Sequence, residues 1–409
     1  MLKSKILKHK AYIFYTFFKY VEYGILAIIF MSFANLVTPE EYGRASIGFQ
    51  VVTYSAFIVM GVNQVLLKRY SLEENKQLKH FFVQYNVFYN LLVCLFSILL
   101  ISILFSSKDY VIYLSLICGV KLILESAIAI NRVNGNMVKI NIIYLSYSVL
   151  FLVLFFSFVS NVFNFFKYWS YSIVFGACIG ALLSFIQVFK SFDVTIFKKY
   201  FKDYYKVLFN DGIKLALISL ISPLFSTLNI ICLNLFKIDE AVIGNFQLAD
   251  NIANMVSLGG ASVLFIVFPD VIKQISKDKT KIQSFYTIGI KILVSSIIAL
   301  IVLYYPLKEA LVYFFPEYQK LSYLILFTLI SRLLILLLFI PNSVWITFSK
   351  EKIYIKSAVL GVLIMGVVFV VFLNYASVDA IYNYFLIFQI LFLIGLHIYF
   401  KRKINTSIL

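Results

Sequence analysis

Eight charged side chains lie inside otherwise apolar stretches of this 409-residue sequence. Five are cations and three are acids: Lys19, Lys121, Lys214, Lys291 and Arg332, and Glu22, Glu125 and Asp250. An unpaired charge at the centre of a bilayer costs roughly 2.5–3.5 kcal/mol on insertion scales, so such residues usually mark a polar cavity or a site. Arginine binds phosphate or carboxylate through a bidentate fork, and lysine binds them as a point charge. The surplus of two cations favours an anionic ligand.

Four of these charges form two lysine–glutamate pairs, and the members of each pair lie one turn apart on the same expected helix. Lys19 and Glu22 are three residues apart and could pair, but they share one helix face with four polar residues, which favours a polar cavity. Those four are Tyr12, Tyr15, Thr16 and Tyr23. Lys121 and Glu125 are four residues apart, and the spacing leaves open whether they neutralise each other or form part of a site.

The other three cations differ in their surroundings. Arg332 has no acid within four residues, so its partner must come from another segment, and it is the strongest candidate for a ligand contact. Lys214 lies at the start of its apolar stretch, from where its side chain can extend to the membrane surface. Lys291 is about seven residues into its stretch, and both roles stay open for it.

The elements that carry these charges are transmembrane helices. The chain is 62% hydrophobic and only 13% charged. That hydrophobic fraction is more than the core of a soluble protein of this length can bury. About twelve apolar spans are each close to the roughly 20 residues that a crossing helix needs. They lie near 11–36, 44–67, 81–105, 110–130, 138–159, 168–189, 211–236, 241–268, 284–305, 320–340, 353–374 and 380–400.

The net charge of +17 follows this topology. Connections of one parity hold 25 Lys and Arg residues, and those of the other parity hold 6. By the positive-inside rule both termini are cytoplasmic. The basic surplus is therefore explained without nucleic acid. The basic, aromatic segment 190–210 is expected to be an amphipathic linker on the inner leaflet, between a six-helix lobe at 1–189 and a second at 211–409.

Polar side chains recur on one face of the first two helices of each half. Gln50 belongs to such a face in the second span, and Asn251 to one in the eighth, beside Asp250 and Asn254. These faces either line a central cavity or join helices through hydrogen bonds worth about 0.6–2 kcal/mol each. Lining is favoured for the first and eighth spans, and the two alternatives are balanced for the second and seventh.

A weak internal repeat relates the two halves. The stretches "NLVTPEEYGRASIGFQ" at 35–50 and "LFKIDEAVIGNFQLADN" at 235–251 share a helix end, a short acidic turn, a glycine and a helix with a polar face. Aligning Gly43 with Gly244 gives an offset close to half the chain. Six spans followed by six, both halves starting inside, predict two parallel bundles, an architecture typical of transporters.

At these two turns the chain resembles the Wzx-type O-antigen flippases, in the polysaccharide-transport family of the MOP superfamily. The residues that carry the resemblance are Leu36, Pro39, Glu40, Glu41, Tyr42, Gly43, Gly61 and Lys68-Arg69 in the first half, and Asp239, Ile243, Gly244, Phe246, Leu248, Ala249 and Pro269 in the second. The resemblance implies an all-α membrane protein of about 12 helices in a V-shaped, MATE/MurJ-like pair of lobes.

The function that the resemblance implies is a flippase, not an enzyme, working by alternating access in a bacterial inner membrane. Its cargo would be an undecaprenyl-diphosphate-linked oligosaccharide, moved from the cytoplasmic to the outer leaflet. For this anion the lumen candidates are Arg332, Lys19, Lys121, Lys291, Gln50 and Asn251. Glu22, Asp250 and Glu125 are the candidates for coupling to H⁺ or Na⁺. Polysaccharide polymerase and chain-length machinery are the candidate protein partners.

Two other functions remain as alternatives. A cation-coupled multidrug antiporter of the same superfamily would be expected to have an acidic cavity, which the cation surplus opposes. A membrane polysaccharide polymerase or ligase would need a large outer loop, and the longest one here spans only 306–320. No cofactor or metal is expected, because the four cysteines lie apart in apolar runs and the three histidines are scattered.

Overall fold

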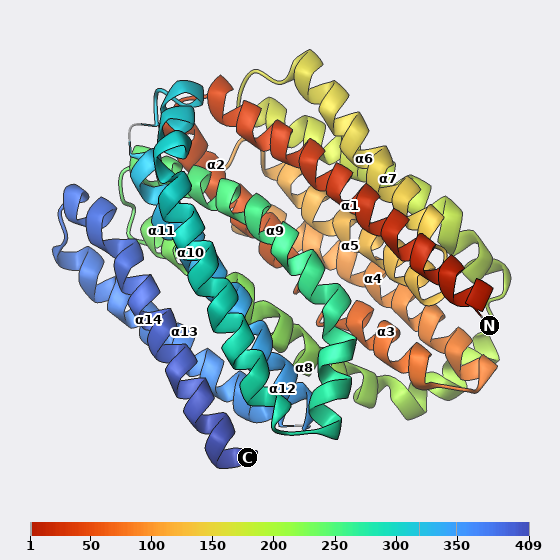
Figure 1. Cartoon of the computed structure of the whole chain (residues 1–409). Coiled ribbons are helices and arrows are strands. Elements are labelled where there is room, and N and C mark those ends of the chain that lie inside the picture. Colours follow the sequence, from red (N-terminus) through yellow and green to blue (C-terminus); the bar gives the residue numbers. More distant parts are fainter. Residues whose placement is uncertain (1, 319, 349, 409) are drawn as a thin grey trace. The chain divides into compact units, whose positions relative to one another are not determined.

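A computed structural model describes residues 2–318, 320–348 and 350–408, with side chains except in 2–16, 71–72, 196, 258–270, 272–273 and 346. These residues form helices and connecting turns, and no strand occurs among them, which confirms the all-α prediction (Figure 1). The helices are α1 (Leu2–Leu36), α2 (Pro39–Ser55), α3 (Val62–Leu72), α4 (Lys76–Leu104), α5 (Val111–Val133), α6 (Met137–Phe158), α7 (Val162–Lys190), α8 (Val194–Leu235), α9 (Glu240–Lys277), α10 (Lys281–Phe314), α11 (Leu321–Leu337), α12 (Phe339–Thr347), α13 (Glu351–Tyr375) and α14 (Val378–Ser407).

Two of the expected spans are interrupted. The second divides into α2, which ends at Ser55, and α3, which begins at Val62, because the turn between them includes Met60 and Gly61 with a positive φ that a right-handed helix excludes. The tenth continues past a break at Leu338 into the short α12. The remaining expected spans correspond to one helix each. The count of twelve crossings itself stays a prediction.

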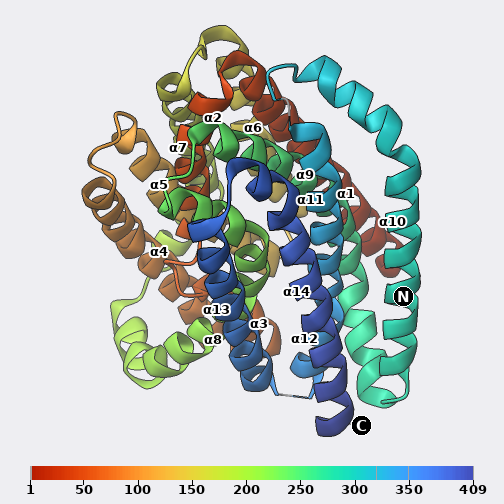
Figure 2. The ribbon, with the colours of Figure 1, turned by 90° about the vertical axis from the view of Figure 1, so that its left-hand side faces the viewer.

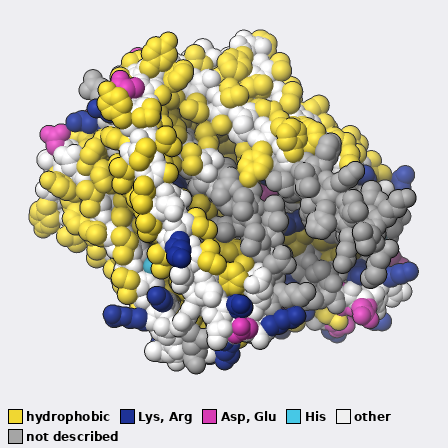
Figure 3. Space-filling model, in the orientation of Figure 1, with side chains coloured by type: hydrophobic (Ala, Val, Ile, Leu, Met, Phe, Trp, Pro, Cys, Tyr) yellow, Lys and Arg dark blue, Asp and Glu magenta, His cyan; other side chains and the backbone are white. Residues whose placement is uncertain are grey.

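Ten helices of the described part are long and apolar enough to cross a membrane, so this is a multi-pass membrane protein. They include α10, α13 and α14, whose outer faces carry exposed side chains such as Val302, Leu363 and Leu391. Figure 3 shows hydrophobic side chains covering this flank, with Lys and Arg gathered along its lower edge. Lipid is the solvent that such a surface requires.

Residues 190–210 are not a separate element in the structure. They comprise the end of α7, a short turn and the first part of α8, which runs on to Leu235 with Pro223 inside it. The predicted amphipathic segment is therefore continuous with the seventh span. Its placement on the inner leaflet stays a prediction.

The chain divides into two compact units. Unit 1 comprises residues 1–36 and 48–217, and unit 2 comprises 37–47 and 218–409. Helices α2 and α8 each belong partly to one unit and partly to the other. In unit 1, α5 packs against α4 and α7, and α1 packs against α6. In unit 2, α11 packs against α9, α10 and α14, and Figure 2 shows α11, α13 and α14 side by side.

The beginning of α2 is built from local capping and a close contact with α9. Thr38 and Glu41 form a reciprocal capping box, in which each side chain accepts from the other residue's backbone N–H, and Pro39 occupies the first turn. A Cβ at Gly43 would overlap the carbonyl oxygen of Glu240, and one at Gly244 would overlap that of Pro39. The two glycines that the repeat aligns thus lie against each other's helices within unit 2.

Candidate functional site

The intramembrane charges of α1 form an ion pair. Lys19 Nζ lies 2.5 Å from Glu22 Oε2, one turn along the same helix. The Lys19 side chain is 17% exposed and the Glu22 side chain 2%. The local spacing of three residues brings the two groups together without help from another element.

Helix α6 completes this group with two tyrosines. The hydroxyl of Tyr147 donates to Glu22 Oε1, and the Tyr144 ring centroid lies 3.4 Å from Lys19 Nζ. Tyr23 presents a second ring to the same ammonium, at 4.6 Å. Ring faces stabilise a cation by about 0.5–2 kcal/mol, depending on exposure. We call Lys19, Glu22, Tyr144 and Tyr147 the Lys19 cluster.

Helix α5 contributes the second pair of charges in unit 1. No ion pair joins Lys121 to Glu125 in the described part of the chain; Lys121 Nζ instead donates to the carbonyl oxygen of Val52 on α2, at 3.3 Å. Lys121 interacts electrostatically with Glu22, and Glu125 with Lys19 and Lys121. The four charges therefore form one neutral group in unit 1.

In unit 2 the partner of Arg332 is Asp250. Arg332 Nη2 on α11 donates to Asp250 Oδ1 on α9, and the two side chains are only 7% and 2% exposed. Asn254, one turn further along α9, donates to the other carboxylate oxygen at 3.3 Å. The expectation that the partner of Arg332 comes from another segment is met. We call Arg332, Asp250 and Asn254 the Arg332 cluster.

The polar face of α9 continues beside this cluster. Gln247 donates to Asn251 Oδ1 at 3.0 Å, and Asn251 Nδ2 donates to the buried Tyr42 hydroxyl of α2 at 2.7 Å. The first of these hydrogen bonds lies within α9, and the second joins α9 to α2, as expected of polar side chains that link helices. In this conformation the α9 face is therefore engaged with protein.

The remaining predicted residues lie outside both clusters. Lys291 is exposed on α10, as Lys214 is on α8. Gln50 is buried on α2, two residues before the carbonyl that accepts from Lys121. The surplus of two intramembrane cations thus belongs to the exposed lysines, and each buried cluster is formally neutral. The cation surplus does not distinguish a flippase from an antiporter at the buried positions.

The residues that sequence reasoning missed are the tyrosines. Tyr144 and Tyr147, with Ser148, recur at three- and four-residue steps on α6, the pattern that identified the polar face of α1. Applied to that helix, the same test would have found them. Tyr42 belongs to the turn that carries the family resemblance, and its hydrogen bond to Asn251 joins residues 209 apart in the chain, a separation that periodicity cannot reveal.

The comparisons with known proteins cover most of the chain. Residues 9–273 match a family model described as "Polysaccharide biosynthesis protein". No curated protein matches the sequence. The fold is similar to an inward-facing multidrug resistance MATE family transporter of the MOP superfamily, with a TM-score of 0.62 and 14% identity over 95% of each chain.

Other solved structures give the same result. The Vibrio cholerae MATE transporter VcmN has a TM-score of 0.63 and 14% identity over 99% of each chain. A MATE in complex with MaL6 has a TM-score of 0.64 and 12% identity, over 98% of this chain and 97% of that one. At these identities the similarity shows the fold alone, and that fold is MATE-like.

Proposed function

The chain belongs to the polysaccharide biosynthesis protein family, and from this we propose that it is a flippase for a lipid-linked oligosaccharide. The resemblance to MOP-superfamily flippases is confirmed by the family match and the MATE-like fold, which together support a membrane transporter. The cargo we propose is an undecaprenyl-diphosphate-linked repeat unit of O-antigen or another surface polysaccharide. It moves from the cytoplasmic to the outer leaflet of a bacterial inner membrane by alternating access of two lobes.

The observation that carries this proposal is the family match over residues 9–273, well over half of a chain with cations inside its spans. A diphosphate needs counter-ions wherever it leaves water, and lysine and arginine supply them. Lys291 is exposed and can meet an anion without prior rearrangement, whereas Lys19 is partly exposed and must first exchange its ion pair with Glu22. Lys121, Gln50 and Asn251 remain proposed contacts that require their present protein partners to exchange for ligand.

Arg332 can bind the cargo only after its ion pair with Asp250 is broken. Protonation of Asp250 would replace the carboxylate by a neutral acid and leave the guanidinium free to form a fork with phosphate. Glu22 can release Lys19 in the same way, and Glu125 lies in the same group of charges. We therefore propose that these acids couple transport to H⁺. Na⁺ is the alternative coupling ion, and it would bind the carboxylate in place of the Arg332 or Lys19 side chain.

The proposal is tested with protein reconstituted into vesicles that contain a fluorescent polyprenyl-diphosphate oligosaccharide. Transfer between leaflets is measured for wild type, Arg332→Ala and Lys19→Ala, with Lys214→Ala as a control that removes an exposed lysine outside both clusters. We expect wild-type transfer, a loss of about tenfold or more in the first two variants, and no change in the control. Elution of each variant as a single species separates loss of transport from loss of fold.

Three other outcomes would change the proposal. Transfer that survives both cluster substitutions would keep the flippase and remove these residues from its site. Absence of transfer together with efflux of small cationic dyes would show a multidrug antiporter; one structure that shares this fold is named a multidrug resistance transporter. Polymerisation or ligation of the saccharide by the purified protein would show an enzyme.

Co-purification with a polysaccharide polymerase or its chain-length partner would identify the machinery that receives the cargo.

A further inference from the structure

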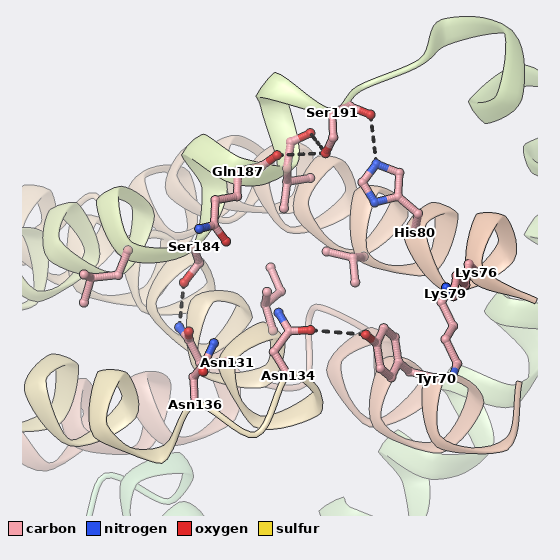
Figure 4. Close-up of a pocket in the computed structure, with 14 residues that line it drawn as sticks. Tyr70, Lys76, Lys79, His80, Asn131, Asn134, Asn136, Ser184, Gln187 and Ser191 are labelled. Carbon is pink, nitrogen blue, oxygen red and sulfur yellow. Dashed lines mark hydrogen bonds between the residues drawn. The ribbon is translucent and has the colours of Figure 1, made fainter. Parts of the chain in front are cut away.

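A cavity of about 330 Å³ lies within unit 1, and no residue of the Lys19 cluster is among those that line it. Five segments meet there: the ends of α3, α5 and α7 and the beginnings of α4 and α6 (Figure 4). Its polar lining consists of Tyr70, Lys76, Lys79, His80, Asn131, Asn134, Asn136, Ser184, Gln187 and Ser191. Two lysines and one histidine are present among the lining residues, and no carboxylate is.

Hydrogen bonds position some of these side chains and leave other donor groups of the lining available for a ligand. Asn134 Oδ1 accepts from the Tyr70 hydroxyl at 3.2 Å, so the amide nitrogen of Asn134 is left to donate. His80 Nε2 lies 2.9 Å from the carbonyl oxygen of Ser191, which can only accept, so this nitrogen carries the proton. The Lys79 ammonium lies 5.2 Å from the Tyr70 ring. The cavity thus offers a positioned amide donor on Asn134, and Gln187 and two lysines are also among its lining residues.

The position of the cavity indicates where its ligand comes from. The connections 67–81, 131–138 and 189–194 meet at the cavity, and the charge count assigns all three to the cytoplasmic side. Exposed apolar side chains continue from it along α7, at Leu182 and Ile186, and along α6, at Ile142. Since α6 and α7 pack together, they form an apolar surface leading from the cavity toward the membrane interior.

We propose that this cavity binds the phosphate headgroup of an anionic phospholipid of the inner leaflet. The two lysines neutralise the phosphate, the amides of Asn134 and Gln187 donate to its oxygens, and the acyl chains lie along α6 and α7. Basic pockets between helices on the cytoplasmic side are suited to such headgroups. The site is separate from the proposed transport of saccharide and does not depend on it.

The test uses the purified full chain in mild detergent and native mass spectrometry, titrated with phosphatidylglycerol or with phosphatidylcholine. Wild type is expected to retain phosphatidylglycerol preferentially. The double variant Lys76→Gln/Lys79→Gln removes two charges worth together roughly a 30-fold change in affinity near an anionic surface. The matched control Lys198→Gln/Lys199→Gln removes two exposed lysines from α8, outside the cavity lining, and is expected to keep the preference.

Each of the following results would overturn the proposal. Equal retention of the two lipids would show that charge is not recognised. An equal loss in the control variant would show a diffuse basic surface rather than a cavity site. Displacement of phosphatidylglycerol by millimolar inorganic phosphate would show a site for soluble phosphate instead of lipid. The thermal midpoint of both double variants in phosphatidylcholine serves to confirm that they remain folded.

Discussion

The two charge clusters place the same chemistry in different settings. The Lys19 cluster rests on a pair three residues apart on one helix, partly exposed and flanked by tyrosine rings. The Arg332 cluster joins two helices through groups 82 residues apart in the chain, both almost fully buried. A local pair forms whenever its helix forms, whereas the long-range pair requires the packing of unit 2. The second should therefore be more costly to break and more useful as a switch.

The largest effect is expected from Asp250→Asn. It leaves the Arg332 guanidinium buried without a counter-charge, which typically costs about 3–5 kcal/mol. Denaturant titration in mixed micelles should show this loss in the apparent free energy of unfolding. The double variant Asp250→Asn/Arg332→Gln should recover most of it, because both charges are then absent. A single variant as stable as wild type would mean that the pair contributes little to unit 2.

Gly43→Ala asks whether backbone packing, rather than charge, makes unit 2 sensitive. The new methyl group would overlap the Glu240 carbonyl, and forcing apart the beginnings of α2 and α9 should cost about 2–3 kcal/mol. Gly395→Ala on α14 is the matched control, since nothing lies within 4 Å of a Cβ there. The same titration applies. Equal behaviour of the two variants would contradict the close contact between α2 and α9.

Glu22→Gln makes the corresponding change in unit 1 and should cost less, about 1.5–2 kcal/mol. Lys19 keeps the rings of Tyr144 and Tyr23 and its partial access to solvent, so its charge is not stranded. The ratio of this loss to that of Asp250→Asn measures the difference between the clusters directly. A loss equal to that of Asp250→Asn would remove the distinction drawn above.

Tyr147→Phe should have the smallest effect, about 1 kcal/mol, because it removes one hydrogen bond and keeps the ring. Combined with Glu22→Gln, it should add little, since the hydroxyl then lacks its charged acceptor. A double-mutant cycle on the unfolding free energies measures this coupling. Additive losses would mean that Tyr147 and Glu22 act independently.

How much could be predicted from the sequence depends on how far apart in the chain the interacting residues lie. The class, the helices and the Lys19–Glu22 pair depend on periodicity and on spacing within one turn, which the sequence displays. The Asp250–Arg332 pair and the Tyr147–Glu22 hydrogen bond join distant residues, 82 and 125 apart, and only tertiary packing brings them together. The surplus of two intramembrane cations could be counted from the sequence. That the two surplus cations are the exposed Lys214 and Lys291 follows only from the burial of side chains in the structure.

The break between α2 and α3 illustrates a partial success. Gly61 was visible in the sequence as part of the resemblance, but nothing local required Met60 and Gly61 to adopt positive φ. A Cβ at Gly61 would overlap the carbonyl oxygen of Gly212 on α8, within unit 1. The close approach of these two backbones, which lie far apart in the chain, requires a residue without a Cβ at the position where α3 begins.

The assignment of residues 37–47 to unit 2 has a consequence for the order of synthesis. Arg44 of this segment pairs with Glu240, 196 residues later in the chain. At about 5–20 residues per second, the segment waits roughly 10–40 s after it is made before its partner helix exists. During that time unit 1 is being completed around the rest of α2. The first unit to fold must therefore leave the beginning of α2 unoccupied and accessible to a unit that is still to be translated.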